Sequence, residues 1–193
     1  MLKDIVTSEV RIKIIHEFFK DVNKPLHIRE LARRVDTEIN AVRRELLRFH
    51  KAGLLKKEAR MNRVYYQIKK DYSIYPEIFS IVAKEIGLGS IIIKNLTELG
   101  KVKFALLSRA FVEGRISTTD QVDLLIVGAV DIKFLQEIIK NYEAHIEREI
   151  NYTVLGEEEF FFVKTRKDPI INGAITQSRV ILVGDENKYC SYI

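Results

Sequence analysis

The sequence has a single cysteine and no long apolar segment, and both absences narrow what the chain can be. Cys190 cannot form a disulfide within the chain, and no second cysteine is present to share a zinc ion with it. No apolar run approaches the roughly 20 residues that a membrane-spanning helix needs. The first residues are of mixed polarity and lack the apolar core of a secretory signal. We therefore expect a cytoplasmic protein in a reducing compartment, without a membrane partner.

Positive charge is concentrated in the first part of the chain. The 193 residues include 32 Lys and Arg against 27 Asp and Glu. Residues 1–70 hold 18 of the basic and 9 of the acidic residues, a net charge of +9, whereas residues 71–193 hold 14 and 18, a net of −4. Such a division indicates two domains, of which the basic one faces a polyanion. Apolar residues make up 47% of the chain, which is sufficient for a packed core.

Three short helices are predicted before Gly53. Ser8 can cap the first, whose apolar residues recur at helical spacing and which ends before Pro25. The second has apolar residues at i, i+3, i+4 and i+7 from Ile28, and a short break separates it from the third, which Thr37 can cap. The third ends at Gly53, a residue suited to the left-handed position after a helix. Two short helices joined by a tight turn form a helix-turn-helix.

A β-hairpin is predicted directly after the third helix. Residues 55–59 and 64–68 have the composition of strands, and the second places Val64, Tyr66 and Ile68 on one face. The polar turn between them, residues 60–63, contains two arginines. A hairpin in this position is the wing of a winged helix-turn-helix, which is the fold predicted for residues 1–70.

These features resemble the winged-helix domain of ArsR-type regulators over about the first 70 residues. The stretches that carry the resemblance are IRELA (28–32), VRREL (42–46), AGLL (52–55) and VYY (64–66). The resemblance implies a transcriptional regulator that binds double-stranded DNA. The metal sensing common in that family is not expected, because His16, His27 and His50 lie on different elements without a ligand pattern.

The third helix is the predicted recognition helix. If Ile39, Val42, Leu46 and Phe49 face the core, the outward residues are Asn40, Ala41, Arg43, Arg44 and Arg48. The N-terminal residues of such a helix lie nearest the bases in the major groove, where Asn pairs with adenine and Arg with guanine. Asn40, Arg43 and Arg44 are therefore predicted to read bases. Later and flanking residues meet phosphates more often, and those predicted to do so are Arg48, Arg60, Asn62 and Arg63, with Arg29 or Lys24.

Residues 71–100 are predicted to form a helical connector. Residues 75–86 repeat apolar side chains at helical spacing, Gly87 to Gly89 interrupt the pattern, and residues 91–99 form a second apolar helix that closes at Gly100. The connector either packs on its own domains or forms a dimer surface. Because winged-helix regulators usually bind two half-sites as symmetric dimers, we favour a homodimer.

Residues 101–193 alternate strands and helices, which predicts a compact α/β domain with a mixed sheet and makes the whole chain α+β. Strands are expected at 104–108, 122–127, 150–155 and 180–183, and helices at 132–146 and from 157 to about 177. Glu157, Glu158 and Glu159 open the last helix, where they match the positive end of its dipole.

This second domain resembles the minimal nucleotidyltransferases. The matching stretches are LLS (106–108), QVDLLIVG (121–128) and EINYTV (149–154). In that family a Gly-Ser turn holds the nucleotide phosphates, and three carboxylates on two strands hold two magnesium ions. Here Leu107 replaces the glycine and Gln121 replaces the first aspartate. Asn151 stands in the region of the third carboxylate, with Glu149 as a displaced candidate.

Ser108, Gln121 and Asp123 are therefore interpreted as a vestigial site without catalytic residues, metal or cofactor, because one carboxylate and an amide cannot balance two divalent cations. We expect this domain to serve in dimerisation, in ligand sensing or in binding a protein partner. Two alternatives stay open. One is an active nucleotidyltransferase that the winged helix directs to its target, and the other is an antitoxin-like module that neutralises a partner protein.

Overall fold

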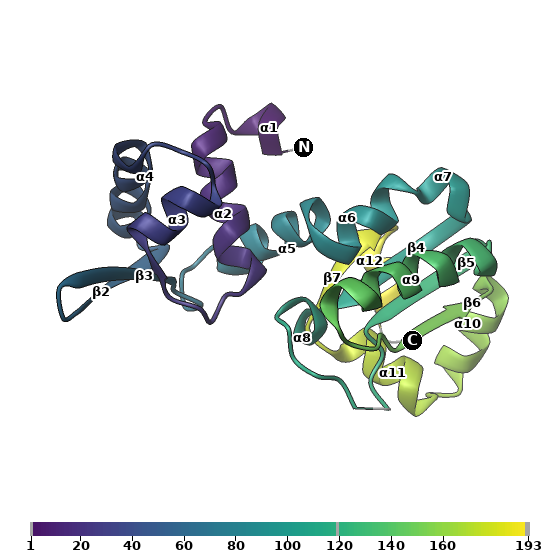
Figure 1. Cartoon of the computed structure of the whole chain (residues 1–193). Helices are drawn as coiled ribbons and strands as arrows, with labels where there is room; N and C mark the ends of the chain where they lie inside the picture. The colour runs from purple at the N-terminus through teal and green to yellow at the C-terminus, as the bar shows by residue number, and fades with distance from the viewer. Residues whose placement is uncertain (1, 119, 192–193) are drawn as a thin grey trace. The chain divides into compact units, whose positions relative to one another are not determined.

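The computed structural model describes residues 2–118 and 120–191, and the chain divides into two compact units, Met1–Glu85 and Ile86–Ile193. Helices and strands occur in both units, each with its own sheet (Figure 1), so the fold class is α+β. The boundary at residues 85 and 86 divides the segment expected as a connector between the two units. Within the described residues, no helix combines the length and the apolar character that crossing a membrane requires.

The first unit begins with helices and ends with a helix that follows a hairpin. The Ser8 hydroxyl caps α2 as predicted, since it accepts a hydrogen bond from the backbone N–H of Arg11 (3.3 Å). Gly53 ends α4 with a φ of +91°, the left-handed conformation expected there. The helices of this unit are α1 (Leu2–Ile5), α2 (Glu9–Lys20), α3 (Ile28–Arg34), α4 (Ile39–Ala52) and α5 (Tyr75–Glu85), and the strands are β1 (Leu26–His27), β2 (Leu55–Arg60) and β3 (Arg63–Ile68).

The start of α4 differs from the prediction. Glu38, not Thr37, occupies the cap position, and its side chain makes no capping hydrogen bond. The Thr37 hydroxyl donates instead to the carbonyl oxygen of Val35 (3.0 Å). Thr37 thus closes the turn after α3 and does not cap α4, because its hydroxyl is bonded to the backbone carbonyl two residues earlier in the chain.

The predicted hairpin is present, and a short third strand joins it. β2 and β3 pair in antiparallel register from Leu55↔Ile68 to Arg60↔Arg63, which leaves Met61 and Asn62 as the turn. β1 pairs with the other edge of β3, and the sheet order is β1-β3-β2. The sequence pattern did not predict β1, because two residues are too few for an alternation to be visible.

The core of the first unit is formed by the apolar faces of its helices. Ile14, Leu31, Val42 and Leu46 are fully buried there. The ring of Phe19 in α2 stacks on the ring of Tyr75 in α5, with 5.7 Å between the two centroids. This contact joins α5 to α2. Burial of each such apolar side chain stabilises the fold by about 1.5–3 kcal/mol. The apolar faces of α3 and α4 therefore pack on the core, and their polar faces are exposed to solvent.

The second unit is built on a four-stranded sheet of order β6-β5-β4-β7. β4 is antiparallel to β5 and to β7, and β5 is parallel to β6, so the sheet is mixed. The strands are β4 (Gly100–Ser108), β5 (Leu124–Val130), β6 (Tyr152–Leu155) and β7 (Arg179–Val183), and the helices are α6 (Gly87–Lys94), α7 (Leu96–Leu99), α8 (Arg109–Val112), α9 (Ile132–Ile146), α10 (Glu157–Thr165), α11 (Pro169–Thr176) and α12 (Glu186–Cys190).

Helices cover both faces of this sheet (Figure 1). Leu125 and Val127 of β5 pack in one cluster with Phe160 of α10, Ile171 of α11 and Tyr189 of α12. Because side chains alternate along a strand, the intervening residues of β5 point to the opposite face, which α9 covers.

Two helices expected as continuous are each broken. The stretch from 157 to about 177 forms α10 and α11, because Pro169 begins a new helix and Asp168 caps it by accepting hydrogen bonds from the N–H groups of Ile170 and Ile171 (both 3.0 Å). The stretch 91–99 is likewise divided at Asn95. The interruption expected at Gly87 to Gly89 is present as the break between α5 and α6, and Gly87, with a φ of +64°, is the first residue of α6.

Candidate nucleic-acid interface

A groove with a volume of about 880 Å³ lies in the first unit between α3, α4 and the hairpin. Its walls combine apolar residues, among them Ile39 and Leu47 of α4 and Tyr65 of β3, with basic ones. The basic residues that line it are Arg29, Arg33, Arg43, Lys57 and Arg63. Three elements that are separate in the sequence therefore bring their cations to one concave surface.

Within residues 2–118 and 120–191, these five cations have no carboxylate partner. Glu30, which also lines the groove, pairs instead with Arg34 (2.6 Å). Uncompensated charges of one sign gathered in a concavity produce a strong local potential, which attracts a polyanion.

The predicted recognition helix presents its expected face to solvent. Asn40, Arg43 and Arg44 are exposed, whereas Ala41 is only half-buried. The Arg43 guanidinium reaches the side-chain oxygen of Asn40 at 3.5 Å, a long contact that a ligand can replace. Arg43 lines the groove, and Asn40 and Arg44 lie outside its lining on the same helix. Val42 and Leu46 are buried as predicted, and Ile39 and Phe49 only partly.

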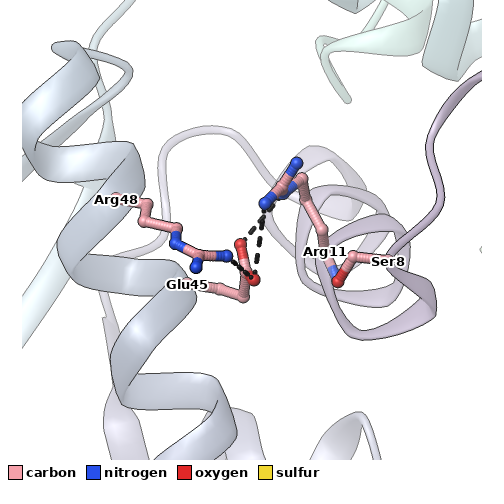
Figure 2. Close-up of polar contacts among 4 residues, drawn as sticks. All are labelled: Ser8, Arg11, Glu45 and Arg48. Atoms are coloured by element: carbon pink, nitrogen blue, oxygen red, sulfur yellow. Dashed lines mark hydrogen bonds and ion pairs between the residues drawn. The ribbon is translucent and has the colours of Figure 1, made fainter.

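Arg48 forms an ion pair with Glu45, which the sequence pattern did not predict. Figure 2 shows Glu45 of α4 between two arginines: Arg11 of α2 donates from Nε to Oε2 (2.9 Å), and Arg48 donates from Nη1 to Oε1 (2.8 Å). Glu45 is buried, so this cluster fixes α4 against α2. The spacing of Glu45 and Arg48 on one helix was a visible signal for their pair, but Arg11 is 34 positions away from Glu45.

The two arginines of the wing are in different states. Arg60 donates from Nε and Nη2 to the two carboxylate oxygens of Glu58 (both 3.0 Å), and these bonds lower the pKa of the Glu58 carboxyl. Arg63 lies opposite Arg60 in the hairpin and faces the groove. Asn62 lines the groove as well. Of the predicted wing contacts, Asn62 and Arg63 therefore line the groove, whereas Arg60 is not part of its lining and forms an ion pair with Glu58.

Two groove residues, Arg33 and Lys57, were not predicted. Arg33 follows Arg29 by four positions, so helical spacing places both on one face of α3, and this was a readable signal. Lys57 lies opposite Tyr66 in the hairpin. This register, and with it the position of Lys57 at the groove, could not be predicted from the neighbouring sequence. His27 fixes the start of α3, because its Nδ1 accepts from the N–H of Arg29 (3.3 Å).

In the second unit, the interpreted vestigial residues are only partly brought together. Ser108 and Asp123 are buried and adjacent, since the N–H of Ser108 donates to the carbonyl oxygen of Asp123 (2.7 Å). The Asp123 carboxylate accepts from the Ser117 hydroxyl and from the N–H of Asn151 (3.0 Å). Gln121 is exposed, and its side-chain oxygen accepts from the N–H of Thr118 (3.3 Å).

The arrangement around Asp123 ties a loop to the sheet. The Asn151 side chain donates to the carbonyl oxygen of Thr118 (2.9 Å), so both sides of the loop before β5 are fastened to the start of β6. Glu149, the displaced candidate for a third carboxylate, is exposed. Across residues 2–118 and 120–191, no three His, Cys, Asp or Glu side chains lie close enough together to hold a metal ion.

Comparisons with known proteins do not establish a family. No family model matches the chain, and no curated protein matches it. Reduced HlyU from Vibrio cholerae N16961 aligns with 42% of this chain and 77% of its own, at 18% identity and a TM-score of 0.33. Human N-acetylserotonin methyltransferase in complex with SAM aligns with 51% of this chain and 33% of its own, at 16% identity and a TM-score of 0.28. Structural similarities with TM-scores this low do not indicate a function for this chain.

Proposed function

We propose that this protein is a DNA-binding transcriptional regulator of the cytoplasm, whose first unit binds duplex DNA. One observation carries the proposal: α3, α4 and the hairpin gather five basic side chains in one groove, and none of these is ion-paired in the described part of the chain. A phosphate backbone supplies regularly spaced negative charge, and its neutralisation by Lys and Arg releases counterions.

The order of the elements supports the same proposal. Two helices joined by a turn, followed by a hairpin, are the parts of a winged helix-turn-helix, which ArsR-type regulators use to bind DNA. In this arrangement α4 enters the major groove, where Asn40, Arg43 and Arg44 reach base edges. Arg29, Arg33, Lys57 and Arg63 then contact phosphates on either side. Arg48 and Arg60 contribute less, because Glu45 and Glu58 hold them.

Fluorescence anisotropy with a labelled duplex at low ionic strength tests the proposal. We expect Lys57→Gln and Arg63→Gln each to weaken binding, roughly three- to tenfold, because each removes one phosphate contact. Lys140→Gln, at an exposed lysine of α9, is the matched control and leaves binding unchanged. Absence of binding by the wild type, or an equal loss in the control, would contradict the proposal.

We propose further that the second unit does not transfer nucleotides and serves in dimerisation and in binding a ligand or protein partner. Its mixed sheet is compatible with a nucleotidyltransferase-like ancestry. Both carboxylate oxygens of Asp123 accept hydrogen bonds from the protein, and Gln121 brings no charge beside it. Incubation with labelled ATP and magnesium is expected to give no transfer. Transfer that Asp123→Ala abolishes would instead favour the enzyme.

A homodimer is proposed because a symmetric pair presents two recognition helices to two half-sites. The support in this chain is β6, which pairs with β5 alone among the described residues and leaves one edge open in the second unit. Sedimentation equilibrium over a range of concentrations tests this. A dimer is expected, and a monomer at every concentration would contradict it.

A further inference from the structure

The outer face of α10 in the second unit exposes an aromatic ring. Three consecutive phenylalanines occur in this helix, and they do not share one environment. Phe160 is fully buried and Phe161 packs against the same core cluster, whereas Phe162 is 56% exposed. Ile170, at the start of α11, is exposed as well. Large apolar side chains that gather at a surface are typical of a contact with another molecule.

Opposite charges lie at equal distances on the two sides of Phe162. Glu158 is four positions before it and Arg166 four positions after it, and both are exposed, so helical spacing places all three on one face. The Arg166 guanidinium carbon lies 4.2 Å from the centroid of the Phe162 ring. Among residues 2–118 and 120–191, neither Glu158 nor Arg166 forms an ion pair, whereas Glu157 pairs with Lys188 (2.6 Å).

A face with this order of charges is complementary to itself. If two copies of the helix pack antiparallel about a two-fold axis at Phe162, the rings meet at the centre and Glu158 of each copy lies opposite Arg166 of the other. A parallel arrangement would place like charges together. An anionic lipid surface would be repelled by Glu158 and Glu159. A second copy of this chain therefore matches the aromatic centre and both charged ends of the face.

We propose that α10 forms the interface of the homodimer, with two copies antiparallel across Phe162. This inference rests on the homodimer proposed above and names its contact surface. α10 begins one residue after β6, whose outer edge is open in the described sheet (Figure 1). Helices of 9 residues bury less area than a standard interface, which needs about 1,200–2,000 Å². The dimer is therefore weak in solution, with a dissociation constant on the order of micromolar, and adjacent half-sites on a duplex hold the two copies together.

Sedimentation equilibrium of the full chain tests the aromatic contact. We expect Phe162→Gln to weaken dimerisation roughly tenfold or more, because the substitution removes a ring from both copies at the centre of the interface. Ile132→Gln is the matched control, since Ile132 is an exposed apolar residue of α9 in the same unit. It is expected to leave the dissociation constant unchanged. Circular dichroism confirms that each variant is folded.

Charge reversal tests the antiparallel arrangement. Glu158→Arg and Arg166→Glu each place like charges opposite one another in a symmetric pair, and each should weaken dimerisation roughly three- to tenfold. The double variant with both substitutions restores opposite charges and is expected to dimerise within about threefold of the wild type. Helix stability does not explain such a recovery, because both reversed charges oppose the dipole of α10.

An equimolar mixture of the two single variants provides a second form of rescue. One chain then has two basic side chains on this face and the other has two acidic ones. The mixture should therefore associate more tightly than either variant alone.

The outcomes separate this inference from the homodimer itself. A wild-type dimer that Phe162→Gln leaves unchanged overturns the assignment of α10, and the homodimer then uses another surface. A double variant as weak as the single variants, together with no gain in the mixture, overturns the antiparallel arrangement. A wild type that is monomeric at every concentration overturns both the inference and the homodimer, while DNA binding is tested independently by anisotropy.

Discussion

Carboxylates of the first unit neutralise some of its arginines and leave others uncompensated, and Glu17 and Glu30 hold Arg34 in this way. Glu45 holds Arg11 and Arg48, and Glu58 holds Arg60. The spacing of residues in the sequence predicts which arginines lie on the outer face of a helix. It does not predict which of them form ion pairs with a carboxylate. Arg43 and Arg63 line the groove without an ion pair among the described residues, so under the proposed function we expect them to contribute more to DNA binding than Arg48 and Arg60.

Removal of the Glu58 carboxylate is expected to strengthen DNA binding. Glu58→Gln releases Arg60 and removes a negative charge that repels phosphates, so affinity should rise roughly threefold at low salt. The protein's stability should not change measurably, because the pair is exposed. Anisotropy titration checks the affinity. Glu137→Gln, at an exposed site on α9, serves as control, and weaker binding by Glu58→Gln would contradict the account.

Glu45 is expected to matter for stability. Glu45→Ala leaves Arg11 without its acceptor and opens the link between α2 and α4, which should cost about 1–3 kcal/mol. Urea unfolding followed by circular dichroism measures this loss. Arg48→Ala is the milder companion, because Arg48 is largely exposed. Equal stability of Glu45→Ala and the wild type would show that the cluster does not fix α4.

His16 gives the first unit a dependence on pH. Burial lowers the pKa of His16 below its ordinary 6.5, and the nearby Glu85 carboxylate (3.4 Å) only partly offsets this. The unfolded chain thus binds a proton at His16 more readily than the folded one. Stability is complete above the unfolded pKa and falls as pH drops through 6.5 toward the folded value. His16→Gln should fall less steeply in urea titrations between these limits, and an identical fall would contradict the assignment.

At the scale of elements, the close approach of β4 and β5 depends on one glycine. Gly128 has a φ of +145°, and a Cβ there would lie 2.2 Å from the carbonyl oxygen of Lys101, beside a bulge in β4. Gly128→Ala should therefore destabilise the second unit by more than about 3 kcal/mol.

The matched control for Gly128→Ala lies on a helix of the same unit. Gly173→Ala in α11 meets no atom within 4 Å and should stabilise by about 0.5–1 kcal/mol. Thermal unfolding compares the two variants. Similar melting temperatures would show that the β4–β5 contact can relax around an added methyl group.

The elements that the sequence predicted well have strong local signals. Helical spacing and Gly53 defined α4, and strand alternation at Val64 to Ile68 defined β3. The elements it missed depend on single residues or on distant pairing. Pro169 divides a helix whose apolar pattern continues across it, and β1 exists only because it pairs with β3. The same limit applies to the groove, since Lys57 joins Arg29 and Arg43 only through the fold.

At the scale of the whole molecule, the division of charge follows the division of structure. The net charge of +9 lies in residues 1–70, within the unit that ends at Glu85, and the sequence alone indicated this separation. At Asp123 the sequence pattern indicates where the carboxylate lies but not which groups it contacts. Asp123 lies directly before β5, where the resembled family has a catalytic carboxylate, and its side chain accepts hydrogen bonds from Ser117 and Asn151.

The measurement that tests the central claim most directly is the salt dependence of duplex binding. If the four groove cations assigned to phosphates meet them, log K should fall with log salt with a slope of about −3 to −4. The triple variant Arg33→Gln, Lys57→Gln and Arg63→Gln should reduce the magnitude of that slope by about three. A wild-type slope near zero, or a slope that the triple variant leaves unchanged, would contradict the assignment of this groove to DNA.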